Sequence, residues 1–174
     1  KDIDYLIIGA GIVGYSTAIY LREIYPKSKI IIIERGLIPS GASSKNAGFT
    51  CFGSASEIYS DLQKYKEEDV WDTIKLRWEG LCNLRKLIGD KNLKLERTGS
   101  WDLITNKEMK IFEDIKKQIP YYNQKLKEIT NENNTYFIDD NVNNKFGFKN
   151  IKTSVFNRLE GLIDTSSMNQ EFQK

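Results

Sequence analysis

The sequence contains no histidine. Residues 1–174 therefore lack a Ser-His-Asp triad, a histidine general base and any histidine metal ligand. Cysteine is almost as scarce, because Cys51 and Cys82 are the only two in the chain. Two thiols are too few for a Cys-rich zinc site or a disulfide framework, so we predict no metal site and favour a reducing, cytoplasmic setting.

An excess of one charge is also missing. The chain has 26 Lys and Arg residues against 24 Asp and Glu. They are spread evenly, so no basic stretch indicates a nucleic-acid partner. The apolar stretch Leu6–Leu21 falls short of the ~20 residues that a membrane span needs, and the acidic start of the chain is unlike a secretory signal. These observations indicate neither a nucleic-acid partner nor a membrane span, and they do not fix the oligomeric state.

The first 34 residues have a β-α-β pattern. Ile3–Ile8 is a short apolar run, Ile12–Tyr25 has the character of a helix, and Ile30–Ile33 is an unbroken run of β-branched residues. Such continuous runs predict strands of a parallel sheet that are buried on both faces. The order indicates an α/β fold.

Three glycines occupy the connection between the first strand and the helix, in the pattern G-x-G-x-x-G. Gly9 permits a tight turn, Gly11 lets a pyrophosphate approach the backbone, and Gly14 lets the helix pack closely on the sheet. The unpaired N–H groups at the start of the helix and the helix dipole favour an anion there. Glu34 follows Gly14 by 20 residues, where an acceptor for a ribose hydroxyl is expected, and its charge disfavours a 2′-phosphate. The pattern predicts a dinucleotide site and leaves NAD and FAD both open.

Small and hydroxylated residues are concentrated after the second strand, in the segment P-S-G-A-S-S-K-N-A-G-F at positions 39–49. An NAD-binding unit does not need such a loop. A flavin cofactor does, because N–H groups and hydroxyls must line its pyrophosphate, its ribityl chain and one side of its ring. The loop favours FAD, with an NAD-dependent dehydrogenase and a non-catalytic flavin- or nucleotide-binding module as the alternatives.

The remaining elements follow from periodicity and turn residues. The sequence predicts a helix from Ser54 or Ser56 to about Tyr65, an amphipathic helix over 70–88, and a helix over 112–129 that Pro120 kinks or breaks. It predicts a hairpin within Leu93–Ile104 that turns at Thr98-Gly99-Ser100, and strands at Tyr136–Ile138 and Ser154–Arg158. Asp164 or Thr165 is expected to cap a last helix. The apolar seam of the 112–129 helix is expected to pack on the domain's own sheet.

Together with the glycine pattern, Ser40-Gly41-Ala42-Ser43 and Asn46-Ala47-Gly48 resemble the D-amino-acid oxidase (DAO) superfamily of FAD-dependent oxidoreductases. The likeness is greatest to its amine and amino-acid branch. Thr98-Gly99-Ser100-Trp101 resembles that family's entry into the substrate domain, and Glu160-Gly161-Leu162-Ile163-Asp164 resembles the segment before its return helix. Members that tether flavin through a histidine in the first loop have it near residues 43–46, where this chain has none.

The resemblance implies FAD as the cofactor and oxidation of an amine or amino-acid C–N bond by hydride transfer to the flavin. It implies a small-molecule amine or amino acid as the substrate. It also implies that 1–90 are the first part of a Rossmann-like FAD-binding domain, that 91–161 are the start of an α+β substrate domain, and that 162–174 are a return helix toward the FAD-binding domain. Family enzymes are about twice this length, so we expect an amino-terminal fragment with an incomplete fold, inactive alone. No catalytic residue is assigned. The implied cofactor-binding residues are Gly9, Gly11, Ile12, Val13, Gly14, Glu34, Arg35, Ser43, Ser44, Asn46, Ala47, Gly48 and Phe49.

Overall fold

A computed structural model describes residues 2–174. The chain divides into two compact units. Unit 1 comprises residues 1–49, 87–95 and 163–174, and unit 2 comprises residues 50–86 and 96–162. The chain therefore leaves unit 1, passes through unit 2, and returns to unit 1 twice. The assignment of 1–90 and 91–161 to a FAD-binding and a substrate domain stays a prediction.

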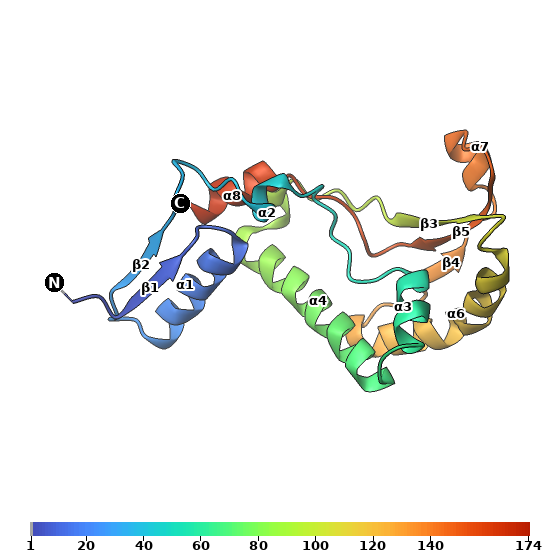
Figure 1. The fold of residues 1–174 in the computed structure, drawn as a ribbon, viewed down its shortest axis with the longest axis horizontal. Helices are drawn as coiled ribbons and strands as arrows, with labels where there is room; N and C mark the ends of the chain where they lie inside the picture. Colours follow the sequence, from blue (N-terminus) through green and yellow to red (C-terminus); the bar gives the residue numbers. More distant parts are fainter. Residues whose placement is uncertain (1) are drawn as a thin grey trace. The chain divides into compact units, whose positions relative to one another are not determined.

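Unit 1 is built on a parallel strand pair. Strands β1 (Tyr5–Ile8) and β2 (Ile30–Ile33) pair in register, and helix α1 (Ile12–Ile24) connects them. Figure 1 shows α1 running beside the two strands, and Ile7 of β1 lies against Gly14 of α1. The predicted β-α-β pattern is confirmed, with the bounds of β2 unchanged and those of β1 and α1 shorter by one or two residues.

The opposite face of this strand pair is open. Leu6 and Ile8 are 54% and 83% exposed, and alternation along a strand places both on the face that α1 does not cover. Ile33, the partner of Ile8, is 46% exposed. The prediction that both strands are buried on both faces is therefore wrong for Leu6, Ile8 and Ile33, because a two-stranded ladder with one helix has cover on one side only.

Three short helices complete unit 1: α2 (Ala42–Lys45), α5 (Asp90–Leu93) and α8 (Thr165–Phe172). As predicted, Asp164 caps α8, accepting the N–H of Ser167 at 2.8 Å. The Lys94 ammonium lies 2.7 Å from the other oxygen of Asp164. This ion pair, together with the Ser167 N–H, lowers the pKa of Asp164 to about 2. The start of α8 is thereby fixed to residues next to α5.

Unit 2 contains an antiparallel sheet in the order β3-β5-β4. Its strands are β3 (Ser100–Thr105), β4 (Tyr136–Ile138) and β5 (Ile151–Asn157), and a row of three aromatic rings, Trp101, Phe156 and Phe137, crosses them on one face. The predicted hairpin at 98–100 is wrong, because β3 pairs with β5. Gly99 has a φ of +73°, and a Cβ there would lie 2.1 Å from the Phe156 ring. This glycine therefore serves packing beneath Phe156 rather than a hairpin turn.

Four helices belong to unit 2 wholly or largely: α3 (Ala55–Leu62), α4 (Glu67–Ile88), α6 (Met109–Thr130) and α7 (Val142–Phe146). Ser54 caps α3, as predicted, by accepting the N–H of Glu57. Helix α6 continues through Pro120. Its apolar seam is buried and packs on the sheet and on α3, which confirms that expectation (Figure 1). The main buried members of the core are Phe52, Ile58, Trp71, Ile74, Ile104, Phe112, Ile115, Tyr122, Leu126, Tyr136 and Val155.

A buried carboxylate fixes the segment that enters unit 2. Glu160 is 4% exposed. One oxygen accepts the N–H groups of Phe52 and Gly53 at 3.0 and 3.4 Å, and the other accepts the hydroxyl of Ser100 at 2.5 Å. Burial raises the pKa of Glu160, against the lowering effect of these donors. Strand β3 and the residues before α3 are thus joined through one side chain.

Within residues 2–174, no helix combines the length and the apolar character that crossing a bilayer requires. The observed elements are a parallel strand pair with its connecting helix and a small antiparallel sheet backed by helices. This architecture confirms the predicted fold class.

Two isoleucines on α6 test the core. Ile115 is 1% exposed and Ile111 is 50% exposed. We expect Ile115→Ala to lower the free energy of unfolding by about 2–5 kcal/mol and Ile111→Ala to change it by about 0.5 kcal/mol or less. Urea unfolding followed by tryptophan fluorescence reports on unit 2, because Trp71, Trp78 and Trp101 all lie there. Equal losses in the two variants would contradict the placement of α6.

Candidate functional site

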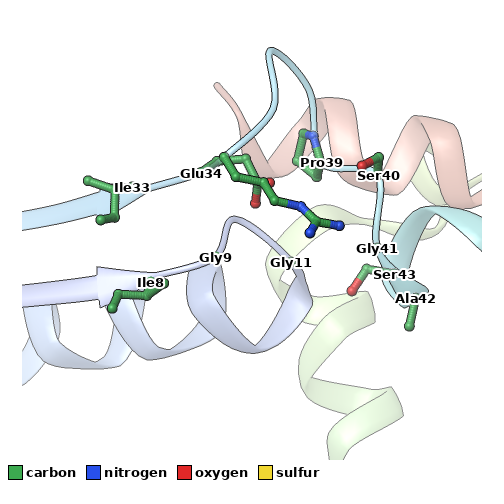
Figure 2. A pocket seen from close by; sticks show the side chains of 11 residues that line it. Ile8, Gly9, Gly11, Ile33, Glu34, Pro39, Ser40, Gly41, Ala42 and Ser43 are labelled. Carbon is green, nitrogen blue, oxygen red and sulfur yellow. The ribbon is translucent and has the colours of Figure 1, made fainter.

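A cavity of about 450 Å³ opens in unit 1 where β1 and β2 end. The ends of two parallel strands and the start of the intervening helix form its floor, and the loop after β2 forms its wall (Figure 2). This position, outside the carboxyl ends of parallel strands, is where nucleotides bind in α/β proteins. The cavity is lined by Ile8, Gly9, Gly11, Ile33, Glu34, Arg35, Pro39, Ser40, Gly41, Ala42 and Ser43.

The glycine turn has the geometry that its sequence predicts. Gly9 has a φ of +100°, which favours glycine, and a Cβ there would meet no heavy atom within 4 Å. A Cβ on Gly14 would lie 2.0 Å from the backbone oxygen of Gly9 and 3.4 Å from Ile7. Only glycine at position 14 therefore allows α1 to begin this close to the strand. The start of α1 is held directly over the end of β1.

Two N–H groups of this turn are taken by side chains from the loop beyond β2. The Ala10 N–H donates to the Glu34 carboxylate at 2.9 Å, and the Ile12 N–H donates to the Ser43 hydroxyl at 3.0 Å. A Cβ on Gly11 would lie 3.0 Å from the Ser43 hydroxyl oxygen, a tight contact. Gly11 therefore leaves room for Ser43 as well as for a ligand.

Glu34 remains an acceptor at the edge of the cavity. Its carboxylate accepts the N–H of Ala10 at 2.9 Å and that of Gly36 at 3.3 Å. These N–H donors hold the pKa of Glu34 below its ordinary value of 4.5, and the N–H group of Ala10 has the largest effect. A carboxylate has about four lone-pair positions, so two backbone donors leave acceptors for ribose hydroxyls.

Internal hydrogen bonds fix the small-residue loop. The Ser44 hydroxyl donates to the Pro39 carbonyl at 2.6 Å, and the Asn46 side chain donates to the carbonyls of Ala42 and Ser43. Asn46 also accepts the N–H of Gly48 at 2.8 Å. Gly48 has a φ of +75°, and a Cβ there would lie 2.2 Å from the Ile163 carbonyl oxygen. The loop is thus shaped before any ligand binds.

The residues proposed for cofactor binding from sequence divide into two groups. Five line the cavity: Gly9, Gly11, Glu34, Arg35 and Ser43. The other eight lie outside the lining: Ile12, Val13, Gly14, Ser44, Asn46, Ala47, Gly48 and Phe49. Among these eight, Ile12 donates its N–H to Ser43, and Gly14 allows α1 to pack close to β1. The hydrogen bonds and packing within the loop involve Ser44, Asn46 and Gly48. Val13 and Phe49 are 75% and 69% exposed.

Sequence reasoning omitted six lining residues. Four of them belong to the small-residue loop, namely Pro39, Ser40, Gly41 and Ala42. Their position next to Ser43 is the signal in the sequence that could have placed them in the site. Ile8 and Ile33 are the last residues of β1 and β2 (Figure 2). Any residue that ends a parallel strand beside a glycine turn is a candidate to border the ligand.

The residues present fit the adenosine diphosphate part of FAD. The cavity offers an acceptor for ribose in Glu34 and a hydroxyl in Ser43 beside the N-terminus of α1. Positions 9 and 41 are glycines whose Cβ would occupy open space, so a ligand can approach the backbone there. A helix N-terminus attracts an anion through its free N–H groups and its dipole.

Comparison with known proteins decides between NAD and FAD as the cofactor. The sequence matches the DAO family, described as FAD dependent oxidoreductase, over residues 4–174. The chain belongs to the DAO family of FAD-dependent oxidoreductases. FAD is the cofactor of this family, and the choice of FAD over NAD from the small-residue loop is thereby confirmed.

Solved structures of two oxidases share the fold of this chain. Glycine oxidase from Bacillus cereus ATCC 14579 matches with a TM-score of 0.55 and 22% identity, over 98% of this chain and 42% of that one. Iminodiacetate oxidase from Chelativorans sp. BNC1 matches with a TM-score of 0.64 and 19% identity, over 97% of this chain and 42% of that one. At these identities the likeness concerns the fold alone.

A curated relative is similar to this chain in sequence. The probable malate:quinone oxidoreductase of Prochlorococcus marinus (strain MIT 9515) is 29% identical over 106 residues, which cover 54% of this chain and 21% of that protein. The chain therefore spans less than half the length of each of these relatives.

Alanine at two of the glycines separates the two roles of the turn. In Gly11→Ala the added methyl displaces the Ser43 hydroxyl, so we expect FAD affinity to fall about tenfold with little change in the melting temperature of the cofactor-free protein. In Gly14→Ala the methyl meets a backbone oxygen that cannot move, so we expect the melting temperature itself to fall. Gly80→Ala is the control, because a Cβ there meets no heavy atom within 4 Å. Normal FAD binding by Gly11→Ala would contradict this geometry.

Removing the Glu34 carboxylate tests the ribose acceptor. We expect Glu34→Gln to weaken FAD binding about tenfold, because a charge-assisted hydrogen bond is lost. The pKa of Glu34 lies below its ordinary value of 4.5, so the carboxylate is ionised at neutral and mildly acidic pH. The ratio of wild-type to variant affinity should therefore be constant from about pH 5 to about pH 8. Fluorescence titration with FAD measures it, and a ratio near one would argue against the assignment.

Proposed function

We propose that the protein oxidises a C–N bond of an amine or amino acid with FAD as the acceptor. The observation that carries the proposal is one cavity that gathers the glycine turn, Glu34 and the small-residue loop. Support comes from solved relatives named for amino-acid substrates, namely glycine oxidase and the L-amino acid deaminase of Proteus vulgaris, the latter matching over 99% of this chain with a TM-score of 0.63.

The residues of this chain bind and orient the cofactor in this proposal. Glu34 accepts from the adenosine ribose, and the start of α1 with the Ser43 hydroxyl receives the pyrophosphate. When bound, FAD would supply the two-electron acceptor for the hydride, one proton with two electrons, that the substrate carbon loses. Loss of hydride from carbon requires the amine to be neutral, so the substrate must release a proton before it reacts. No histidine is available in residues 1–174 to take that proton.

A second candidate is oxidation of a hydroxy acid at a C–O bond. The sequence match to a probable malate:quinone oxidoreductase favours it. The binding of the adenosine diphosphate part of FAD would be the same, because both reactions use the same cofactor. The two candidates differ in the substrate alone.

Anaerobic reduction of the flavin distinguishes the candidates. The protein, produced at its encoded length and loaded with FAD, is mixed without oxygen with glycine, sarcosine, D- and L-amino acids, malate and glycerol phosphate. We expect an amine or amino acid to bleach the visible flavin absorbance and the hydroxy compounds to leave it unchanged. Bleaching by malate alone would select the second candidate. Bound flavin that no compound reduces would support a non-catalytic binding module.

A further inference from the structure

Helix α8 supplies a side chain to the small-residue loop. Asn169 is 7% exposed. Its amide nitrogen donates to the Ser43 carbonyl at 3.1 Å and to the Thr165 carbonyl of its own helix at 2.7 Å. It also lies 3.5 Å from the Ser44 hydroxyl. Asn169 and Ser43 are separated by 126 residues, so this contact joins the last element of unit 1 to the wall of the cavity.

Ser43 needs such a contact because helix α2 is short. Four residues make about one helical turn, which is not stable alone in water. The Ser43 carbonyl accepts two amide donors, Asn46 at 3.0 Å from within the loop and Asn169 at 3.1 Å from α8. The first moves with the loop. The second ties the loop to α8, which also stacks on α1 through the rings of Phe172 and Tyr15, 5.4 Å apart.

The Ser43 hydroxyl has one hydrogen to donate. Its oxygen accepts the Ile12 N–H at 3.0 Å, and a hydroxyl that accepts still keeps its own proton. That proton is available to an anionic oxygen at the start of α1. A small displacement of the Ser43 backbone moves the hydroxyl away from Ile12 and from the anion together.

We propose that Asn169 is a positioning residue: through the Ser43 carbonyl it holds the Ser43 hydroxyl where the cofactor's pyrophosphate binds. The proposal rests on FAD binding at this cavity. The amide oxygen of Asn169 is buried without a hydrogen-bond partner among the described residues. A buried unpaired acceptor disfavours folding. A role in stability alone therefore does not account for an amide at this position. The N–H group of the same amide, in contrast, donates to the Ser43 carbonyl.

A double-mutant cycle tests the proposal with ADP, which carries the pyrophosphate without the flavin. Asn169→Leu keeps the volume of the side chain and removes its donor. We expect this variant of the full chain to bind ADP and FAD three- to tenfold more weakly, with a melting temperature without ligand that is unchanged or higher. In a Ser43→Ala background the same substitution should have no further effect on ADP affinity, because the group it positions is gone. Gln170→Ala, at an exposed neighbouring position, is the control.

The outcomes are distinct. If Asn169→Leu lowers ADP affinity equally with and without Ser43, or lowers the melting temperature as its main effect, Asn169 is structural and the proposal fails. If it leaves ADP affinity unchanged while the wild-type protein binds ADP, the proposal also fails and the assignment of the cavity stands. A wild-type protein that binds neither ADP nor FAD would overturn the cavity assignment itself.

Discussion

The backbone oxygen of Gly9 lies 2.0 Å from the point that a Cβ on Gly14 would occupy. The rest of the site depends on this close approach of α1 to the Gly9 backbone, which only glycine at position 14 permits. Glycine at position 14 lets α1 begin immediately above the end of β1, where the N–H groups of Ala10 and Ile12 donate to Glu34 and Ser43. The in-register pairing of Ile8 with Ile33 then brings Glu34 beside Ala10. One missing side chain thus sets the distance between the anion-attracting end of a helix and the carboxylate that follows the neighbouring strand.

The second half of the site comes from a distant part of the chain. The loop that contains Ser43 is closed by Ile163, whose N–H donates to Gly48 at 2.8 Å, and by Asn169. Between these segments the chain builds all of unit 2, with its own core and sheet. Contacts at such sequence separation form late in folding, because the loop entropy must be overcome first. The glycine turn, which needs only local contacts, can form before its wall is in place.

Local signals were sufficient for the parts of the fold that local contacts determine. The glycine spacing, the run Ile30–Ile33 and the capping residue Asp164 each predicted an element that the structure contains. The failures have a different cause. Gly99 was interpreted as a turn residue, but a long-range partner, Phe156, sets its conformation. The pairing of β3 with β5 spans some 50 residues and leaves no periodic signal. Asn169 was absent from the predicted site for the same reason, since an asparagine in a short helix shows nothing of the carbonyl it reaches.

Unit 1 holds its site mainly with hydrogen bonds. Of the buried hydrophobic residues in the described part of the chain, only Ala10, Leu93 and Met168 belong to it, and Leu6 and Ile8 remain exposed on the strand pair. Burial of apolar surface is the main source of stability in folded proteins, so this unit gains little from its own core. A ligand that binds only the folded form adds stability that grows with its concentration relative to its dissociation constant. The cofactor would bridge α1, the end of β2 and the loop at Ser43, in addition to the hydrogen bonds that join these segments within the chain. We therefore expect cofactor binding to stabilise the folded form of unit 1, because few of the buried apolar residues belong to this unit.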